Sequence, residues 1–287
     1  MVRSGAEVIG ITAVHGNSPL ANTARNALNL VELLGADIPV FAGAERALLE
    51  PPRHAPEVHG QDGFGNSFLP EPKRRLEQQH AVDFILEAAD RYSGELRILA
   101  IGPLTNLALA IAKDRGIVKK IDRIICMGGT SDARGNATPV SEFNIHADPE
   151  AAAVVLESGV PVTLVPWEAT MQGIILPEDL DRLAASDKPL PSFFTKATRT
   201  LVDLVERRLG MRGVILADLA AAAVALEPET MTEQAQAHVT VETGGRISRG
   251  LTAVDYHGLL GETPHVTVCL KVDRRRVADL LVRSFTA

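Results

Sequence analysis

One short polar segment of this 287-residue chain carries the side chains most suited to binding a small, hydroxyl-rich ligand. Within nine residues it holds Asn136, Glu142, Phe143 and Asn144. Amide groups both donate and accept hydrogen bonds, and a carboxylate accepts from two hydroxyls, so this set suits a polyhydroxyl ligand. A polar loop that caps the following helix explains the same residues equally well, and both interpretations stay open at this point.

Two further residues have the chemistry of a site. Asp218 is the one acidic residue in the small, apolar run Leu216–Ala223. An isolated buried charge is costly, so its carboxylate must be hydrogen-bonded, neutralised or bound to a metal, although Asp is also a good N-cap for the Ala-rich helix that follows. His59 begins the glycine-rich stretch His59–Gly65 and titrates near neutral pH; an exposed loop histidine is the simpler interpretation.

Val- and Ile-rich runs alternate with helical patterns along the chain, which is typical of a parallel sheet covered on both faces. Strands are expected at 8–14, 96–101, 123–127, 162–166, 238–241 and 266–272, and helices at 23–34, 81–92, 107–113, 149–158, 192–208 and 216–226. The polar stretch 50–72 reads as a long loop. The pattern predicts an α/β fold: one domain over residues 1–287, with a mostly parallel, open sheet.

Ligands of such sheets bind outside the carboxyl ends of the strands. This rule adds Asn17, Met127 and Glu168, each at the end of an expected strand, to the candidate residues. Ordinary turns or a helix cap explain each of them as well.

Composition excludes several classes of function. The formal charge of −7 and an aromatic content of 4% argue against a nucleic-acid partner, which needs basic patches or stacking rings. No apolar run approaches the roughly 18 residues of a membrane span. With two cysteines, Cys126 and Cys269, and no signal-peptide pattern at the start, the cytoplasm is the expected compartment.

The ordered set of motifs resembles the inosine–uridine-preferring nucleoside hydrolase family. The earlier matching stretches are Val8 to Thr12, His15-Gly16-Asn17, Thr23 to Leu28, His59 to Gly63 and Gly102 to Asn106. The most specific are Met127-Gly128-Gly129, Gly135 to Pro139, Glu142 to Ile145 and Asp148 to Ala152. Together they cover nearly the whole chain.

The resemblance implies hydrolysis of the N-glycosidic bond of ribonucleosides, a role in purine and pyrimidine salvage, and a Ca²⁺ that chelates the ribose hydroxyls and a water. Asp218 matches a metal-ligand aspartate, and Ile101 matches the residue that gives its backbone carbonyl to the metal. The implied substrate-binding residues are Asn17, His59, Met127, Asn136, Glu142, Phe143 and Asn144, with His59 on the side of the base.

Three departures from the family pattern bear on activity. The family opens with Asp-x-Asp-x-Gly-x-Asp-Asp, which supplies the general base and most metal carboxylates, and this sequence has no such motif; a first βα element of roughly 30 residues is expected to be missing. Ala217 replaces the histidine that protonates the leaving base, and Trp167-Glu168-Ala169-Thr170 replaces Leu-Asp-Val-Thr. One carboxylate and one carbonyl should bind Ca²⁺ only in the ~10⁻³ M range.

We therefore expect a nucleoside hydrolase that is weak or inactive. Deleting a strand from inside a sheet should also leave an unpaired edge, which predicts a homodimer or homotetramer that covers it. A misplaced initiation codon is one explanation of the short start, and a ribose-binding or scaffold protein without chemistry is the main alternative function. A third interpretation is an unrelated α/β hydrolase with a metal held by Asp62, Glu168 and Asp218. Base selectivity is expected to reside in segments 57–66 and 202–213.

Overall fold

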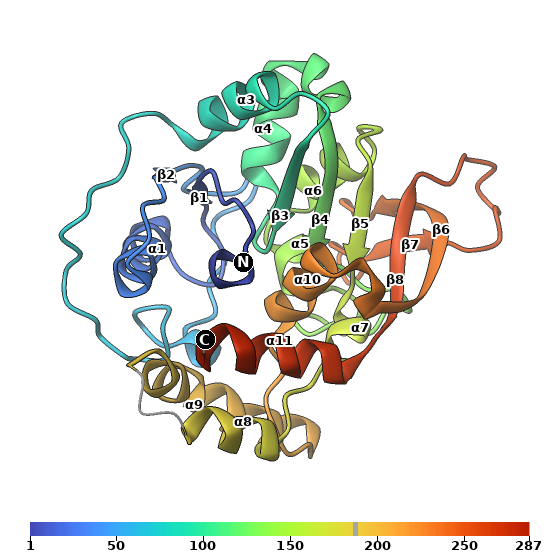
Figure 1. Ribbon diagram of the computed structural model, residues 1–287. Helices are drawn as coiled ribbons and strands as arrows, with labels where there is room; N and C mark the ends of the chain where they lie inside the picture. The colour runs from blue at the N-terminus through green and yellow to red at the C-terminus, as the bar shows by residue number, and fades with distance from the viewer. Residues whose placement is uncertain (186–188, 287) are drawn as a thin grey trace.

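The computed structural model describes residues 1–185 and 189–286. Its main sheet has six strands in the order β3-β4-β5-β8-β6-β7 (Figure 1). Neighbours among the first four are parallel, whereas β6 is antiparallel to β8 and β7 is antiparallel to β6. The strands are β3 (Leu96–Ala100), β4 (Ile121–Met127), β5 (Val162–Val165), β6 (Met231–Val241), β7 (Thr252–Asp255) and β8 (Val266–Val272).

A separate parallel pair, β1 (Ile11–Ala13) and β2 (Val40–Ala42), lies beside β3 (Figure 1). In the described residues β1 pairs only with β2, and β3 pairs only with β4. The unpaired edge explains why the apolar residues of β3 from Ile98 onward are partly exposed, and why Ile101 is 45% exposed, whereas Ile124 in the neighbouring strand is fully buried. It also explains why β1 is shorter than the strand expected at 8–14.

Helices cover both faces of the main sheet. On one face lie α3 (Ala81–Arg91), α4 (Thr105–Lys113) and α6 (Pro149–Leu156), and on the other lie α7 (Trp167–Gln172), α8 (Pro177–Ala184), α10 (Ala217–Leu226) and α11 (Arg274–Thr286). The remaining helices are α1 (Leu20–Leu34), α2 (Pro56–His59), α5 (Phe143–Ala147) and α9 (Pro189–Leu209). The predicted α/β fold, with a mostly parallel sheet and helices on both faces, is confirmed.

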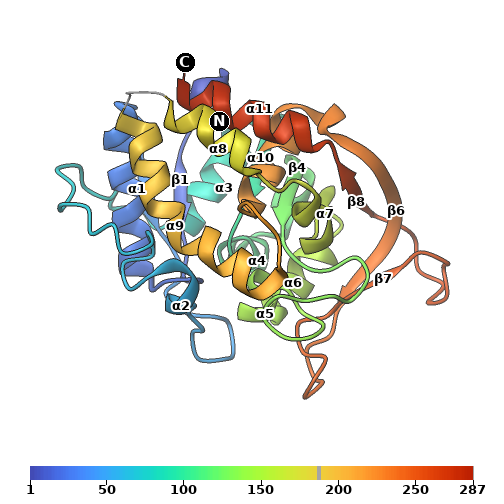
Figure 2. The same cartoon turned by 90° about the horizontal axis from the view of Figure 1, so that it is seen from below.

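The molecule has two distinct ends. Figure 2 shows α1, α2 and α9 at the end that carries β1, and β6 and β7 at the other. The two termini lie close together in both views, and the Arg3 guanidinium donates a hydrogen bond to the Ser284 carbonyl. No helix in residues 1–185 or 189–286 is long and apolar enough to cross a membrane.

Buried polar contacts join the small sheet to the main one. The Thr105 hydroxyl donates to the Asp148 carboxylate at 2.6 Å and therefore accepts from His15 Nε2 at 2.9 Å. Burial lowers the pKa of His15, so the ring stays neutral. Asn106 adds a bond from its side-chain amide to the Ala13 carbonyl at 3.0 Å. The carboxyl end of β1 is therefore fixed beside the start of α4.

Candidate functional site

The candidate residues gather at the carboxyl ends of β1, β3 and β4. Ala100 lies opposite Cys126 in the β3–β4 register, which places Ile101, the next residue along, beside Met127. The Met127 carbonyl accepts a hydrogen bond from the side-chain amide of Asn144 at 3.0 Å. Ile101 is partly exposed to solvent, whereas Met127 is only 3% exposed. The candidate residues at the end of β3 are therefore more accessible than those at the end of β4.

Glu142 is the best-connected side chain of the site. Its carboxylate accepts backbone N–H groups of Gly129 at 2.9 Å, Asn144 at 2.9 Å and Ile145 at 3.3 Å. It thereby caps the short helix α5 and fixes the turn after β4 at the same time. The helix expected to start near Pro149, which this loop was predicted to cap, is capped by Asp148 instead. Burial raises the pKa of Glu142 to about 7, with a smaller contribution from the negative charge of Asp218.

Asp218 lies in the first turn of α10, which packs against β3 and β4. The N-cap of this helix is Leu216 and no side chain caps it, so the interpretation of Asp218 as the N-cap is wrong. Asp218 is exposed to solvent, yet desolvation by the surrounding protein raises the pKa of its carboxyl to about 7. Among the described residues it has no hydrogen-bond partner and is free to meet a ligand.

Asn136 and Phe143 are joined by a hydrogen bond. The Asn136 side-chain oxygen accepts the backbone N–H of Phe143 at 2.9 Å, which leaves its amide nitrogen available. Gly135 allows this loop to close, because a Cβ at Gly135 would lie 2.3 Å from the backbone oxygens of Thr138 and Ser141.

Asn17 and His59 come from different segments but are tied together. The Asn17 carbonyl accepts the backbone N–H of Ala55 at 2.9 Å, just before α2, and His59 ends that helix. The Asn17 side chain has no hydrogen-bond partner within the described part of the chain. Burial lowers the pKa of His59, so at neutral pH the ring is uncharged and suited to hydrogen bonding rather than to donating a proton as imidazolium.

The donor set for a metal is small. Ca²⁺ takes six to eight oxygen ligands, whereas the matched positions offer one free carboxylate, Asp218, and the Ile101 carbonyl. No group of three or more His, Cys, Asp or Glu side chains with metal-binding geometry exists in the described residues. These residues therefore do not fit a fully coordinated Ca²⁺.

The third interpretation, a metal held by Asp62, Glu168 and Asp218, is wrong, because these side chains do not form a metal-binding group in the described residues and two of them accept backbone N–H groups. The Asp62 carboxylate accepts the backbone N–H groups of Phe64, Asn66 and Phe68 at 2.6–2.9 Å. Backbone amides of the loop after β4 occupy the Glu168 carboxylate in the same way. Both side chains hold loops in place and are not free to bind an ion.

Two residues of the site region escaped sequence reasoning. The Thr252 hydroxyl accepts the backbone N–H of Thr130 and donates to the Thr130 carbonyl, both at 2.7 Å. The Tyr256 hydroxyl donates to the Ser131 carbonyl at 3.1 Å. Thr252 lies on the antiparallel strand β7 and Tyr256 lies just after it, more than a hundred residues from the loop they bind. No local sequence pattern predicts these contacts.

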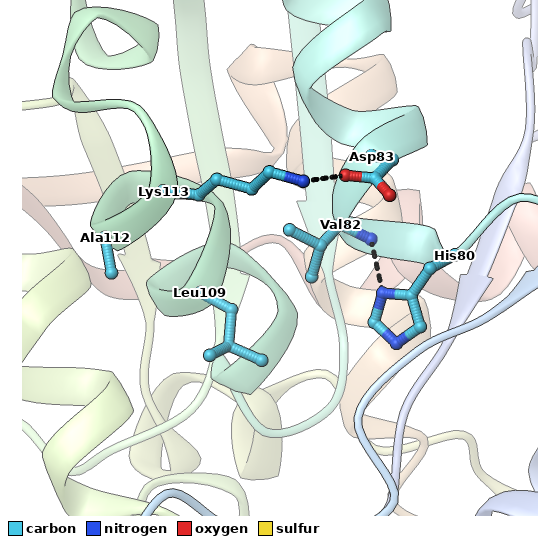
Figure 3. A pocket seen from close by; sticks show the side chains of 6 residues that line it. All are labelled: His80, Val82, Asp83, Leu109, Ala112 and Lys113. Carbon is cyan, nitrogen blue, oxygen red and sulfur yellow. Dashed lines mark hydrogen bonds and ion pairs between the residues drawn. The ribbon is translucent and has the colours of Figure 1, made fainter.

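A hollow of about 430 Å³ lies elsewhere, between α3 and α4 (Figure 3). Figure 3 shows Lys113 and Asp83 paired across it, while His80 accepts the backbone N–H of Val82. None of the candidate site residues lines it. Its two charged side chains, Lys113 and Asp83, pair with each other.

The fold and the candidate residues describe an α/β protein with amide and carboxylate side chains at the carboxyl ends of its strands. The model of the inosine-uridine preferring nucleoside hydrolase family matches residues 1–279, and the chain belongs to that family. The chain is similar to the pyrimidine-specific ribonucleoside hydrolase RihA of Citrobacter koseri, with 36% identity over 277 residues, which is 96% of this chain and 88% of the relative.

Solved structures agree. A plant nucleoside hydrolase superposes with a TM-score of 0.92 at 33% identity, covering 98% of this chain and 91% of that one. A purine-preferring ribonucleoside hydrolase from Gardnerella vaginalis gives 0.91 at 29% identity, with coverages of 98% and 90%. The family assignment made from the motifs is confirmed.

Proposed function

We propose that this protein cleaves the N-glycosidic bond of ribonucleosides to ribose and free base, and that the 287-residue chain does so weakly or not at all. Membership of the family supports the reaction. One observation supports the expectation of weak activity: Asp218 is the one free carboxylate among the candidate residues. A metal ion that activates water needs several hard oxygen ligands.

The residues proposed to bind the ribose, here called the sugar side, are Asn17, Asn136, Glu142 and Asn144, and all of them are present in this chain. Among the described residues the Asn17 side chain has no hydrogen-bond partner, and Asn136 keeps its amide nitrogen free while its oxygen accepts the Phe143 N–H. Asn144 keeps its side-chain oxygen free while its nitrogen donates to Met127. Glu142 retains lone pairs beside its three backbone bonds. We infer that these groups grip the ribose hydroxyls, with Met127 and Phe143 lining the pocket and His59 facing the base.

Calcium is the ion we propose for the family reaction, held here by Asp218 and the Ile101 carbonyl in a weak site at most. The loss of a general base alone lowers a rate by ~10²–10⁴. A second function therefore deserves a test: a ribose- or nucleoside-binding protein without chemistry. The uncommitted amides of the sugar side favour it, because they need no metal to bind a hydroxyl-rich ligand.

Substrate turnover and ligand binding separate the two functions. Hydrolysis of inosine, uridine and p-nitrophenyl riboside would be measured with added Ca²⁺, alongside ribose binding by calorimetry. We expect ribose to bind, the Asn144→Ala variant to lose at least about tenfold in affinity, and turnover to fall at least ~10² below that of a pyrimidine-specific relative. Ribose binding with no turnover supports the binding protein, and the absence of ribose binding contradicts both.

We also propose that residues 1–287 form one domain and that the protein is a homodimer or homotetramer. The partly exposed apolar edge of β3 supports an assembly, because an uncovered strand edge tends to pair with another chain. A monomer at micromolar concentration in sedimentation equilibrium would contradict it. Two free, buried cysteines support a reducing compartment, the cytoplasm, where nucleoside salvage takes place.

A further inference from the structure

Glu168, in the first turn of α7, binds a loop of another segment. Its carboxylate accepts the backbone N–H groups of Ser131 at 2.9 Å, Asp132 at 3.2 Å and Arg134 at 3.3 Å. From the sequence, Glu168 is interpreted as either a helix cap or a carboxylate of the site. Three bonds to one remote loop are neither, because a cap serves the amides of its own helix and a site carboxylate keeps its oxygens for a ligand.

The loop 131–134 needs such a partner. Ala133 has φ 62°, in the left-handed region that residues with a Cβ avoid, and this conformation is disfavoured without surrounding contacts. It also turns the neighbouring amides toward one point, where the Glu168 carboxylate accepts them. The Tyr256 hydroxyl holds the other side of the loop through the Ser131 carbonyl.

Loop 131–134 connects the turn that Glu142 holds, at Gly129, with the segment that carries Asn136. Upstream, Gly129 donates its N–H to Glu142 and accepts the N–H of Trp167, the residue before Glu168. Downstream, the chain passes directly into Gly135 and Asn136. A shift of loop 131–134 would therefore move Asn136 and loosen the turn that Glu142 holds.

We propose that Glu168 is a positioning residue for the sugar site: by clamping loop 131–134 from the end of β5, it fixes the segment 135–144 in its ligand-binding arrangement. The inference rests on the proposed function for the identity of the ligand, but the clamp itself is a property of the fold. The residue does not touch the ligand and acts through backbone that does.

Hydrogen exchange followed by mass spectrometry tests the clamp without requiring catalysis. Glu168→Ala removes both carboxylate oxygens and with them all three hydrogen bonds, and Glu168→Gln keeps one oxygen that can still accept. Asp273→Ala is the matched control, because Asp273 accepts two backbone amides, those of Arg275 and Arg276, at the start of α11. Ribose affinity would be measured by calorimetry on the same four proteins.

In Glu168→Ala we expect the amides of both 131–134 and 135–144 to exchange at least about tenfold faster, and ribose affinity to fall by a similar factor, with unchanged exchange in β4 and α6. Glu168→Gln should lie between this variant and the parent, and Asp273→Ala should match the parent in both segments. Faster exchange confined to 131–134, or unchanged exchange in both, overturns the proposal. If the parent binds no ribose, the proposed function fails, and exchange of 135–144 still decides the clamp.

Discussion

Replacing Glu142 with alanine is expected to lower the free energy of unfolding by about 4 kcal/mol. The substitution leaves the N–H groups of Gly129, Asn144 and Ile145 without their acceptor in a buried place. Each buried amide without a partner costs roughly 1–3 kcal/mol, and the relief of burying a carboxylate offsets part of the sum. Glu142 thus supports the structure as well as the ligand.

Urea unfolding followed by circular dichroism measures this effect. Glu87→Ala is the matched control, because Glu87 is an exposed glutamate of α3 that accepts one hydrogen bond, from the Gln79 side-chain amide at 3.0 Å, and is expected to contribute less than about 1 kcal/mol. A loss below about 1 kcal/mol in Glu142→Ala would show that the three amides find water or other partners, and the described role of Glu142 would be wrong.

The second large expected effect is an increase in the rate of hydrolysis. Adding before Met1 a strand that ends in the family motif Asp-x-Asp-x-Gly-x-Asp-Asp is expected to raise hydrolysis of p-nitrophenyl riboside in the presence of Ca²⁺ by ~10²–10⁴. The added strand has a place to go, because β1 and β3 each present an unpaired edge and their carboxyl ends already lie together. Its acidic residues would arrive beside Ile101 and Asp218.

A second fusion, with the acidic residues changed to asparagine, separates structure from chemistry. It should gain thermal stability like the first, since strand pairing covers the exposed edge of β3, but it should gain no turnover. A stabilised acidic fusion that remains as slow as the parent chain would contradict the view that missing carboxylates limit the reaction.

The sequence was a good guide where a single element carries its own signal. The apolar periodicity of Ala81–Arg91 and the Val-rich run Val266–Val272 predicted α3 and β8 almost to the residue. The helix α11 was missed because it begins with three arginines, Arg274 to Arg276, and its buried stripe is short. The strand β1 is shorter than the strand expected at 8–14, because its length depends on pairing, and in the described residues it pairs only with β2.

The same division applies to the site. The strand-end rule predicted Asn17, Met127 and Glu168 at one edge of the sheet. Glu142 and Asn144 were predicted from their polar segment and from the resemblance to the family. The competing capping roles could not be weighed in advance, since they depend on which amides a carboxylate meets. Glu142 turned out to cap, Asp218 did not, and Glu168 bonds a loop more than thirty residues away.

Titration of the chain with Ca²⁺ by calorimetry, with ribose present at saturating concentration, tests most directly whether this site lacks the acids that hold the ion. We predict a dissociation constant no tighter than ~10⁻³ M, because Asp218 is the one uncommitted carboxylate among the candidate residues, and the described residues contain no group of three or more His, Cys, Asp or Glu side chains that could hold a metal. Micromolar binding that disappears in Asp218→Asn would contradict the account, since other acids of this chain would then have to complete the coordination shell.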